Sequence, residues 1–171
     1  RITAQFHAAF TGMFAGLAAS NLINWFVQAA SSAVPLTANL GYLAAQAALT
    51  VEQFQELEFA VRDAGIGQEA FARASETLAR NLAELNTGTG QFRQFLSQSA
   101  PELLKQFEAV KDVNEAWRLL SDILQRIPNE QDRVLFAQKA LGSEGARLAS
   151  VLARGSFELD RQRQYAHELG V

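Results

Sequence analysis

The first fifty residues of this chain carry almost no charge. Between Ile2 and Val51 there is no Asp, Glu, Lys or Arg, whereas all 18 acidic residues, and every basic residue except Arg1, lie from Glu52 onward. An uncharged, apolar stretch is stable where protein or lipid covers it, and charged helix faces are stable in water. The sequence therefore predicts two segments with different surroundings.

Residues 1–34 are predicted to form one long apolar helix. The stretch from Thr3 to Val34 contains no proline and is rich in Ala, Leu and Phe, and Pro35 marks its end. A helix of this length measures roughly 48 Å, which exceeds the ~30 Å core of a bilayer. The helix could therefore span a membrane, but the Thr, Ser and Asn side chains in its most apolar part leave its surroundings open.

Two side-chain patterns on this predicted helix favour packing against other helices. Small residues recur at every fourth position and would let another backbone approach closely, and phenylalanines form a ridge beside them. The strip consists of Ala8, Gly12, Gly16 and Ser20, and the ridge of Phe6, Phe10 and Phe14. Three surroundings remain open: self-association or packing in a larger assembly, which the strip favours, lipid, and burial within the same domain.

Residues 35–49 are predicted to form a second, shorter apolar helix, and residues 50–171 a series of amphipathic helices. Capping patterns predict helix starts at Thr50, Ser99, Asp112, Asn129 and Ser143. The glycine-rich stretch 86–90 is predicted to be a hinge between helix pairs. The helix after Asn129 is predicted to bury Val134, Leu135, Ala137 and Leu141.

The predicted fold class is therefore all-α. No segment alternates apolar and polar residues over the length of a strand. We expect a string of amphipathic helices that form hairpins or a bundle, with the long apolar helix at the N-terminal end. The apolar faces are extensive enough that we expect oligomerisation to complete the fold.

The sequence predicts no enzyme and no catalytic, cofactor or metal site. There are no cysteines, and neither of the two histidines, His7 and His167, follows a Glu by three residues, as a di-iron helical bundle requires. The acidic residues Glu52, Glu56 and Glu58 are interpreted as a solvated helix face. The net charge of −3 argues against a protein that binds nucleic acid through a phosphate-neutralising surface.

The most specific pattern in the chain is a block of glycine, proline and arginine positions that reads IPNEQDRVLFAQKALGSEGARLASVLARG. Its characteristic residues are Pro128, Arg133, Leu141, Gly142, Gly145, Leu148 and Gly155. The glycines are predicted to mark helix boundaries, except Gly145, which is predicted to permit close approach of a neighbouring helix. An Asp-Ala-Gly-Ile turn at Gly65 and a helix followed by a glycine loop (78–90) precede the block.

Together these features resemble the recurrent helical region of phage tail tape-measure proteins, over Leu49 to Val171. The chain departs from the family pattern at Leu141, where Phe is usual, at Ser143, where a basic residue is common, and at Ser150, where proline is usual. Members of this family are usually much longer than 171 residues, and because the chain begins with Arg1 we expect an internal fragment.

The resemblance implies a structural virion protein. Such a protein would lie in the lumen of the tail tube in several copies, as a trimer or hexamer, and would contact tail-tube and tail-tip proteins. It would set tube length during assembly and leave ahead of the DNA, with no specific nucleic acid as partner. The uncharged N-terminal segment would enter the host envelope during ejection, and the alternative is a membrane-active helical protein that forms a pore or channel.

Overall fold

The computed structural model describes residues 35–170, with side chains from residue 39 onward. This part of the chain is helical, with no strand between residues 35 and 170. The elements are α3 (Pro35–Gln46), α4 (Val51–Ala60), η1 (Arg62–Ala64), α5 (Gln68–Asn86), α6 (Gln91–Ser99), α7 (Pro101–Ala109), α8 (Val113–Arg126), α9 (Glu130–Leu141), η2 (Gly142–Glu144), α10 (Gly145–Leu152) and α11 (Ser156–Leu169).

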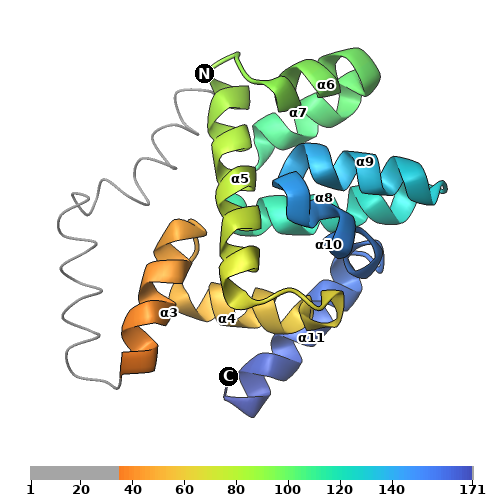
Figure 1. Cartoon of the computed structure of the whole chain (residues 1–171). Coiled ribbons are helices and arrows are strands. Elements are labelled where there is room, and N and C mark those ends of the chain that lie inside the picture. The colour runs from red at the N-terminus through yellow and green to blue at the C-terminus, as the bar shows by residue number, and fades with distance from the viewer. Residues whose placement is uncertain (1–34, 171) are drawn as a thin grey trace.

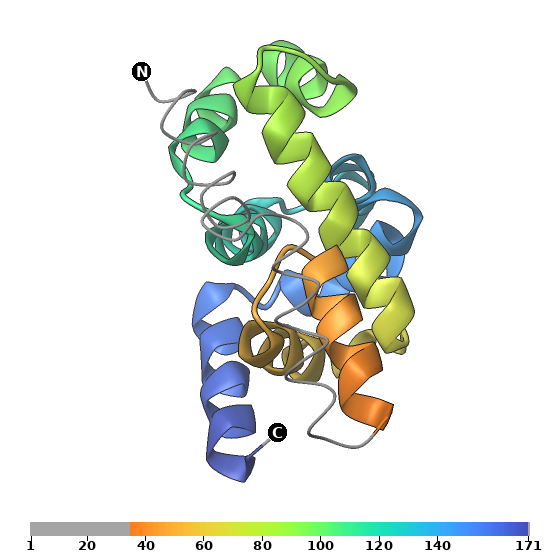
Figure 2. The same ribbon diagram turned by 90° about the vertical axis from the view of Figure 1, so that its left-hand side faces the viewer.

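The helix α5 forms the axis around which the other helices are arranged (Figure 1). The pair α6 and α7 lies beyond its C-terminal end, and α3 and α4 lie near its N-terminal end. Helices α8 and α9 pack beside its middle, and α10 packs on α8 and α9. The last helix, α11, runs beside α4, as the rotated view shows (Figure 2). Residues 35–170 therefore fold back on themselves repeatedly and do not form one extended rod.

Most predicted helix boundaries between residues 50 and 170 are confirmed. Thr50 forms a capping box with Gln53, Asp112 accepts a hydrogen bond from the backbone of Glu115, and Asn129 caps α9. These side chains satisfy amide groups that have no partner inside the first turn of a helix. Local sequence thus determines where α4, α8 and α9 begin.

Three predictions about the charged segment were wrong. Residues 91–99 form a helix that was not predicted, and neither Ser99 nor Ser143 caps a helix, because Ala100 and Glu144 occupy the capping positions without a side-chain hydrogen bond. Leu135 is 46% exposed, and Phe136 is buried in its place. Ala137 and Leu141 are buried as predicted, and Val134 is partly buried against the core.

Aromatic side chains fill the core at two places along α5. Near its N-terminal end, Phe71 stacks on Trp117 with ring centroids 5.1 Å apart and meets Phe54 edge to face at 5.2 Å. Near its C-terminal end, Phe92 of α6 meets Phe107 of α7 at 5.2 Å. Such pairs contribute geometric specificity in addition to their buried area, and they fix the helices at both ends of α5.

A buried serine connects three helical segments at the first of these places. Ser75 of α5 donates a hydrogen bond to the carbonyl oxygen of Ala47 at 2.7 Å, and the indole nitrogen of Trp117 donates to the Ser75 hydroxyl at 3.0 Å. All three residues are fully buried. One hydroxyl therefore satisfies a polar group after α3 and another on α8, which would otherwise lie unpaired in the core.

The expectations for residues 1–34 lie outside the described residues. They comprise the long helix, the small-residue strip (Ala8, Gly12, Gly16 and Ser20) and the aromatic ridge (Phe6, Phe10 and Phe14). Among residues 35–170, no helix combines the length and the apolar character needed to cross a bilayer. The second apolar helix is present as α3, which starts at Pro35, where proline is well tolerated.

We predict that Ser75→Ala lowers the free energy of unfolding by about 1–3 kcal/mol, because it leaves both a buried carbonyl and a buried indole N–H without a partner. Urea denaturation followed by far-ultraviolet circular dichroism measures the change. The control is Ser97→Ala at an exposed position of α6, where the change should stay within about 0.5 kcal/mol. Equal effects of the two substitutions would contradict the bridging role of Ser75.

Candidate functional site

The glycine block forms a tight helical hairpin made of α9, η2 and α10. Helix α9 ends at Leu141, and Gly142 follows with φ = +79°, a conformation that side-chain-bearing residues rarely adopt. The chain then makes one short 3-10 turn and enters α10 at Gly145. Leu141 and Leu148 are buried on either side of this turn, so the hairpin has an apolar interior.

Gly145 is the point of closest approach between the two helices of the hairpin. A Cβ atom placed on Gly145 would overlap the backbone carbonyl of Ala137 and would lie 2.6 Å from the amide nitrogen of Gln138. Because both obstructing groups belong to the backbone of α9, neither could move without shifting the helix. The prediction that Gly145 permits a close helix approach is therefore confirmed.

Arg133 and Gly155 secure the two ends of the hairpin. The guanidinium of Arg133 donates hydrogen bonds to the carbonyl oxygens of Ile127 and Pro128, at the turn from α8 into α9. Gly155 adopts φ = +93° after α10, directly beside the carboxamide of Gln125. The earlier motif glycine, Gly65, also has positive φ, at +70°, and ends η1. The block therefore supplies turns, caps and a helix contact.

The junction between α4 and α11 brings together the polar side chains with the most distinctive geometry. Arg163 donates from both Nε and a terminal nitrogen to one oxygen, Oε2, of Glu56, at 3.2 and 3.0 Å. These two side chains are only 13% and 15% exposed. Since Arg163 occupies Oε2, the other oxygen of Glu56 remains available for a different partner.

His167 and Glu52 complete this cluster at the solvent side of the junction. The Nδ1 atom of His167 lies 3.2 Å from Oε1 of Glu52 and 3.6 Å from Oε1 of Glu56. Residues 52 and 56 share one face of α4, and residues 163 and 167 share one face of α11, because each pair is four positions apart. Two carboxylates and an imidazole thus meet at one point, and sequence analysis had interpreted these acids as a solvated face.

The outer side of α11 carries a separate set of charged groups. Hydrogen bonds from Arg161 and Gln162 lower the pKa of Glu158 to about 2, so this carboxyl stays ionised in mildly acidic solution. Arg161, Tyr165 and Glu168 also line an open surface depression of ≈ 350 Å³. Its lining residues are Arg62, Arg161, Gln162, Gln164, Tyr165 and Glu168, and none of them is a histidine, serine or cysteine.

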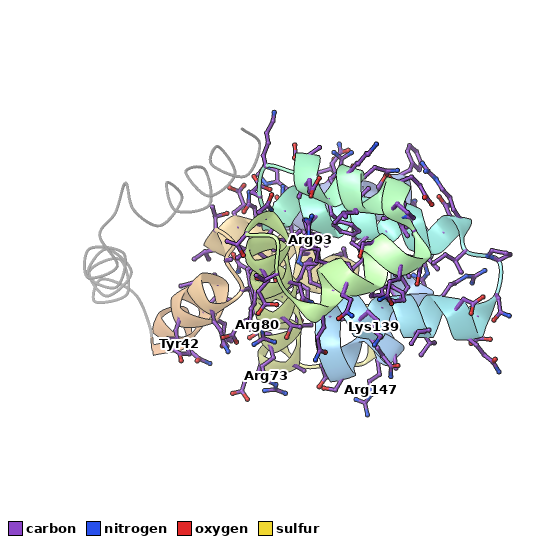
Figure 3. The ribbon with its side chains drawn as sticks, turned by 90° about the horizontal axis from the view of Figure 1, so that it is seen from above. Tyr42, Arg73, Arg80, Arg93, Lys139 and Arg147 are labelled. Atoms are coloured by element: carbon purple, nitrogen blue, oxygen red, sulfur yellow. The ribbon has the colours of Figure 1, made fainter. Side chains whose placement is uncertain are left out.

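Basic side chains of α5, α6, α9 and α10 are visible from above the molecule, and Arg73, Arg80 and Arg147 are among those labelled (Figure 3). Several of these cations already have partners within the fold. Arg73 lies 3.9 Å from Glu144, and Arg93 pairs with Glu108 at 2.8 Å. Mixed charges of this kind are typical of a solvated protein surface.

Apolar side chains are also exposed, mainly on α11. Phe157 is 83% exposed, and Tyr165 and Leu169 follow it along the same helix with about half of their surface in solvent. Tyr42 of α3 is 68% exposed. Exposed aromatic residues are enriched where proteins contact partners, so α3 and α11 are the described elements best suited to contact another surface.

We predict that Gly145→Ala destabilises the protein by about 1–3 kcal/mol, because the added methyl group meets the backbone of α9. The direction of the change is informative, because Gly→Ala inside an unobstructed helix raises the free energy of unfolding by about 1 kcal/mol. Urea denaturation measures the difference in the free energy of unfolding between the variant and the natural protein. Ser150→Ala on the exposed face of α10 is the matched control and should change stability by less than about 0.5 kcal/mol. An increase in stability for Gly145→Ala would rule out the close contact.

The chain was also compared with known proteins. No protein-family model, no curated protein and no solved structure matches it. The assignment of a role therefore depends on the residues and on their geometry.

Proposed function

We propose that this chain is part of a phage tail tape-measure protein, a structural virion component that sets the length of the tail tube and leaves ahead of the genome. The observation that carries the proposal is the glycine block of residues 127–155, whose order and spacing resemble that family. In the fold, each motif glycine has a backbone role that another residue would fill poorly. A pattern with such strict backbone requirements is more informative than a general helical composition.

The protein would act in the lumen of the tail tube, together with other copies of itself and with tail-tube and tail-tip proteins. Exposed apolar side chains support such contacts, above all Phe157 and Tyr42. Trimeric or hexameric assembly would match the symmetry that the family implies. A structural role of this kind requires no catalysed reaction. The glycine block would contribute to it through its backbone geometry and its apolar packing.

The folded form of residues 35–170 affects how such a ruler would work. As one continuous helix these residues would be roughly 200 Å long. A compact domain of this size has a radius of gyration of about 14 Å. A segment folded in this way contributes little to length, so the measuring part of the full-length protein would be continuous helix elsewhere in its sequence.

We predict that deleting an in-frame block of continuous helix outside residues 35–170 shortens the tail by about 1.5 Å for each residue removed. Electron microscopy of the resulting particles measures tail length. Removal of an equally long part of residues 35–170 is the comparison, and because this part is compact it should shorten tails far less per residue. Tails of unchanged length after the first deletion would contradict the ruler role.

A second candidate function is a membrane-active helical protein that forms a pore or channel for the genome. The charge-free stretch from Ile2 to Val34 favours it, since its length suffices to span a bilayer, whereas Leu43, Ala44 and Ala47 farther along are buried in the folded core. The two proposals are compatible if this segment enters the host envelope after ejection. In that case the protein would contact the membrane only after it has been ejected from the tail.

We predict that a peptide of residues 1–34 partitions into liposomes, because it buries a long uncharged surface there. Sedimentation with vesicles measures partitioning, and release of a trapped dye measures permeabilisation. A variant peptide with Gly16→Lys and Ala19→Glu is the control and should bind less. Failure of the natural peptide both to bind and to release dye would count against the membrane-active function and would leave self-association and burial within the same domain as the alternatives.

A further inference from the structure

The cluster of Glu52, Glu56 and His167 is the one group of potential metal ligands among the described residues whose ligand atoms converge. One oxygen of each carboxylate and the Nδ1 atom of His167 all lie within 4.8 Å of one another. These side chains come from two helices that are far apart in the sequence and packed side by side (Figure 2). Their proximity therefore depends on the fold.

We propose that Glu52, Glu56 and His167 form a binding site for a divalent first-row transition metal such as Zn²⁺, which links α4 to α11. Ligand atoms about 2.0–2.2 Å from a tetrahedral zinc ion are roughly 3.4 Å apart. The separations of 3.2 and 3.6 Å from Nδ1 to the two carboxylate oxygens match this spacing. A water molecule would supply the fourth ligand.

Arg163 prepares Glu56 for this role. It holds Oε2 through two hydrogen bonds and so directs Oε1 of the same carboxylate to His167. Groups that fix the orientation of a ligand in this way raise metal affinity. Since Arg163 and Glu56 are largely buried, this orientation is already present in the folded chain.

The accessibility and chemistry of the other two ligands determine which ion fits. Glu52 and His167 are about two-thirds exposed, so a metal ion can enter from solvent. An imidazole nitrogen favours zinc, nickel or copper over magnesium or calcium, which prefer oxygen ligands. Glu52 and Glu56 supply two negative charges to a divalent ion, and Arg163, which pairs with Glu56, contributes one positive charge. The site therefore suits a transition metal that binds reversibly at the surface.

Binding would stabilise the attachment of α11. This helix buries few apolar side chains, Leu159 and Ala166 among them, so a metal bridge to α4 would add considerably to its contacts. A ligand that binds only the folded state raises the melting temperature. The proposal concerns this site alone and does not depend on the role in phage tails.

The test is a zinc titration of the full chain, by isothermal titration calorimetry and by thermal unfolding. We expect one zinc ion per chain, and at free zinc about a hundred-fold above Kd the Tm should rise by roughly 5–10 °C. His167→Ala and Glu52→Gln should each weaken binding by about tenfold or more. Circular dichroism in chelator should give both variants the same helical content as the natural protein, because both side chains are exposed.

Two control variants distinguish this site from binding elsewhere. His7→Ala removes the only other histidine, and Glu168→Gln removes an acid next to His167 that pairs with Gln164 instead. Both should bind zinc like the natural protein. The proposal is overturned if the natural protein shows neither binding heat nor a rise in Tm, if His167→Ala binds equally well, or if His7→Ala abolishes binding.

Discussion

The fold depends on how the carbonyl groups at the ends of its short helices find hydrogen-bond donors. Every helix leaves up to four such groups without an internal partner, and a chain of many short helices has many of them. Here, side chains of neighbouring helices donate to several: Ser75 to Ala47, Ser121 to Leu152, and Asn81 to Lys139 and Ala140. Each of these bonds both satisfies a helix end and fixes its position on another helix.

These donors also explain why polar side chains occur in the core. Ser75 and Ser121 are fully buried, and each reaches a carbonyl that lies about thirty positions away in sequence. Directly after α10, the side chain of Asp122 on α8 accepts a hydrogen bond from the first amide of α11. Helix α8 therefore organises the ends of both α10 and α11, and a loss of its register would affect three helices.

The features that could be predicted from the sequence are those determined by residues within about one helical turn of each other. The caps at Thr50, Asp112 and Asn129, and the role of Gly142 as a helix end, follow from residues three or four positions apart. Gly145 could be predicted as well, because a glycine inside a helix needs a packing reason. The helix at residues 91–99 was missed because no capping residue precedes it: Gly90 stands at its start, with φ = +94°.

Contacts between distant residues could not be predicted in this way. Glu56 and Arg163 are 107 positions apart, and nothing in either helix indicates the other. A search for metal ligands within one helix therefore passes over Glu52, Glu56 and His167, since two helices contribute them. The exposed position of Leu135 has a similar cause, because the buried face of α9 is set by Phe136, which packs on aromatic rings of α6 and α7.

Helix α11 combines polar contacts between distant residues with exposed apolar side chains. Its attachment relies strongly on polar contacts: Arg163 with Glu56, Arg118 with Asp160, and the amide of Ser156 with Asp122. Such contacts, where they are exposed to solvent, contribute little individually, while the apolar Phe157 and Leu169 remain uncovered. Elements with few buried contacts open most readily and respond most to ligands and partners. A metal bridge or a second protein surface would therefore act on α11 before it affected the core around α5.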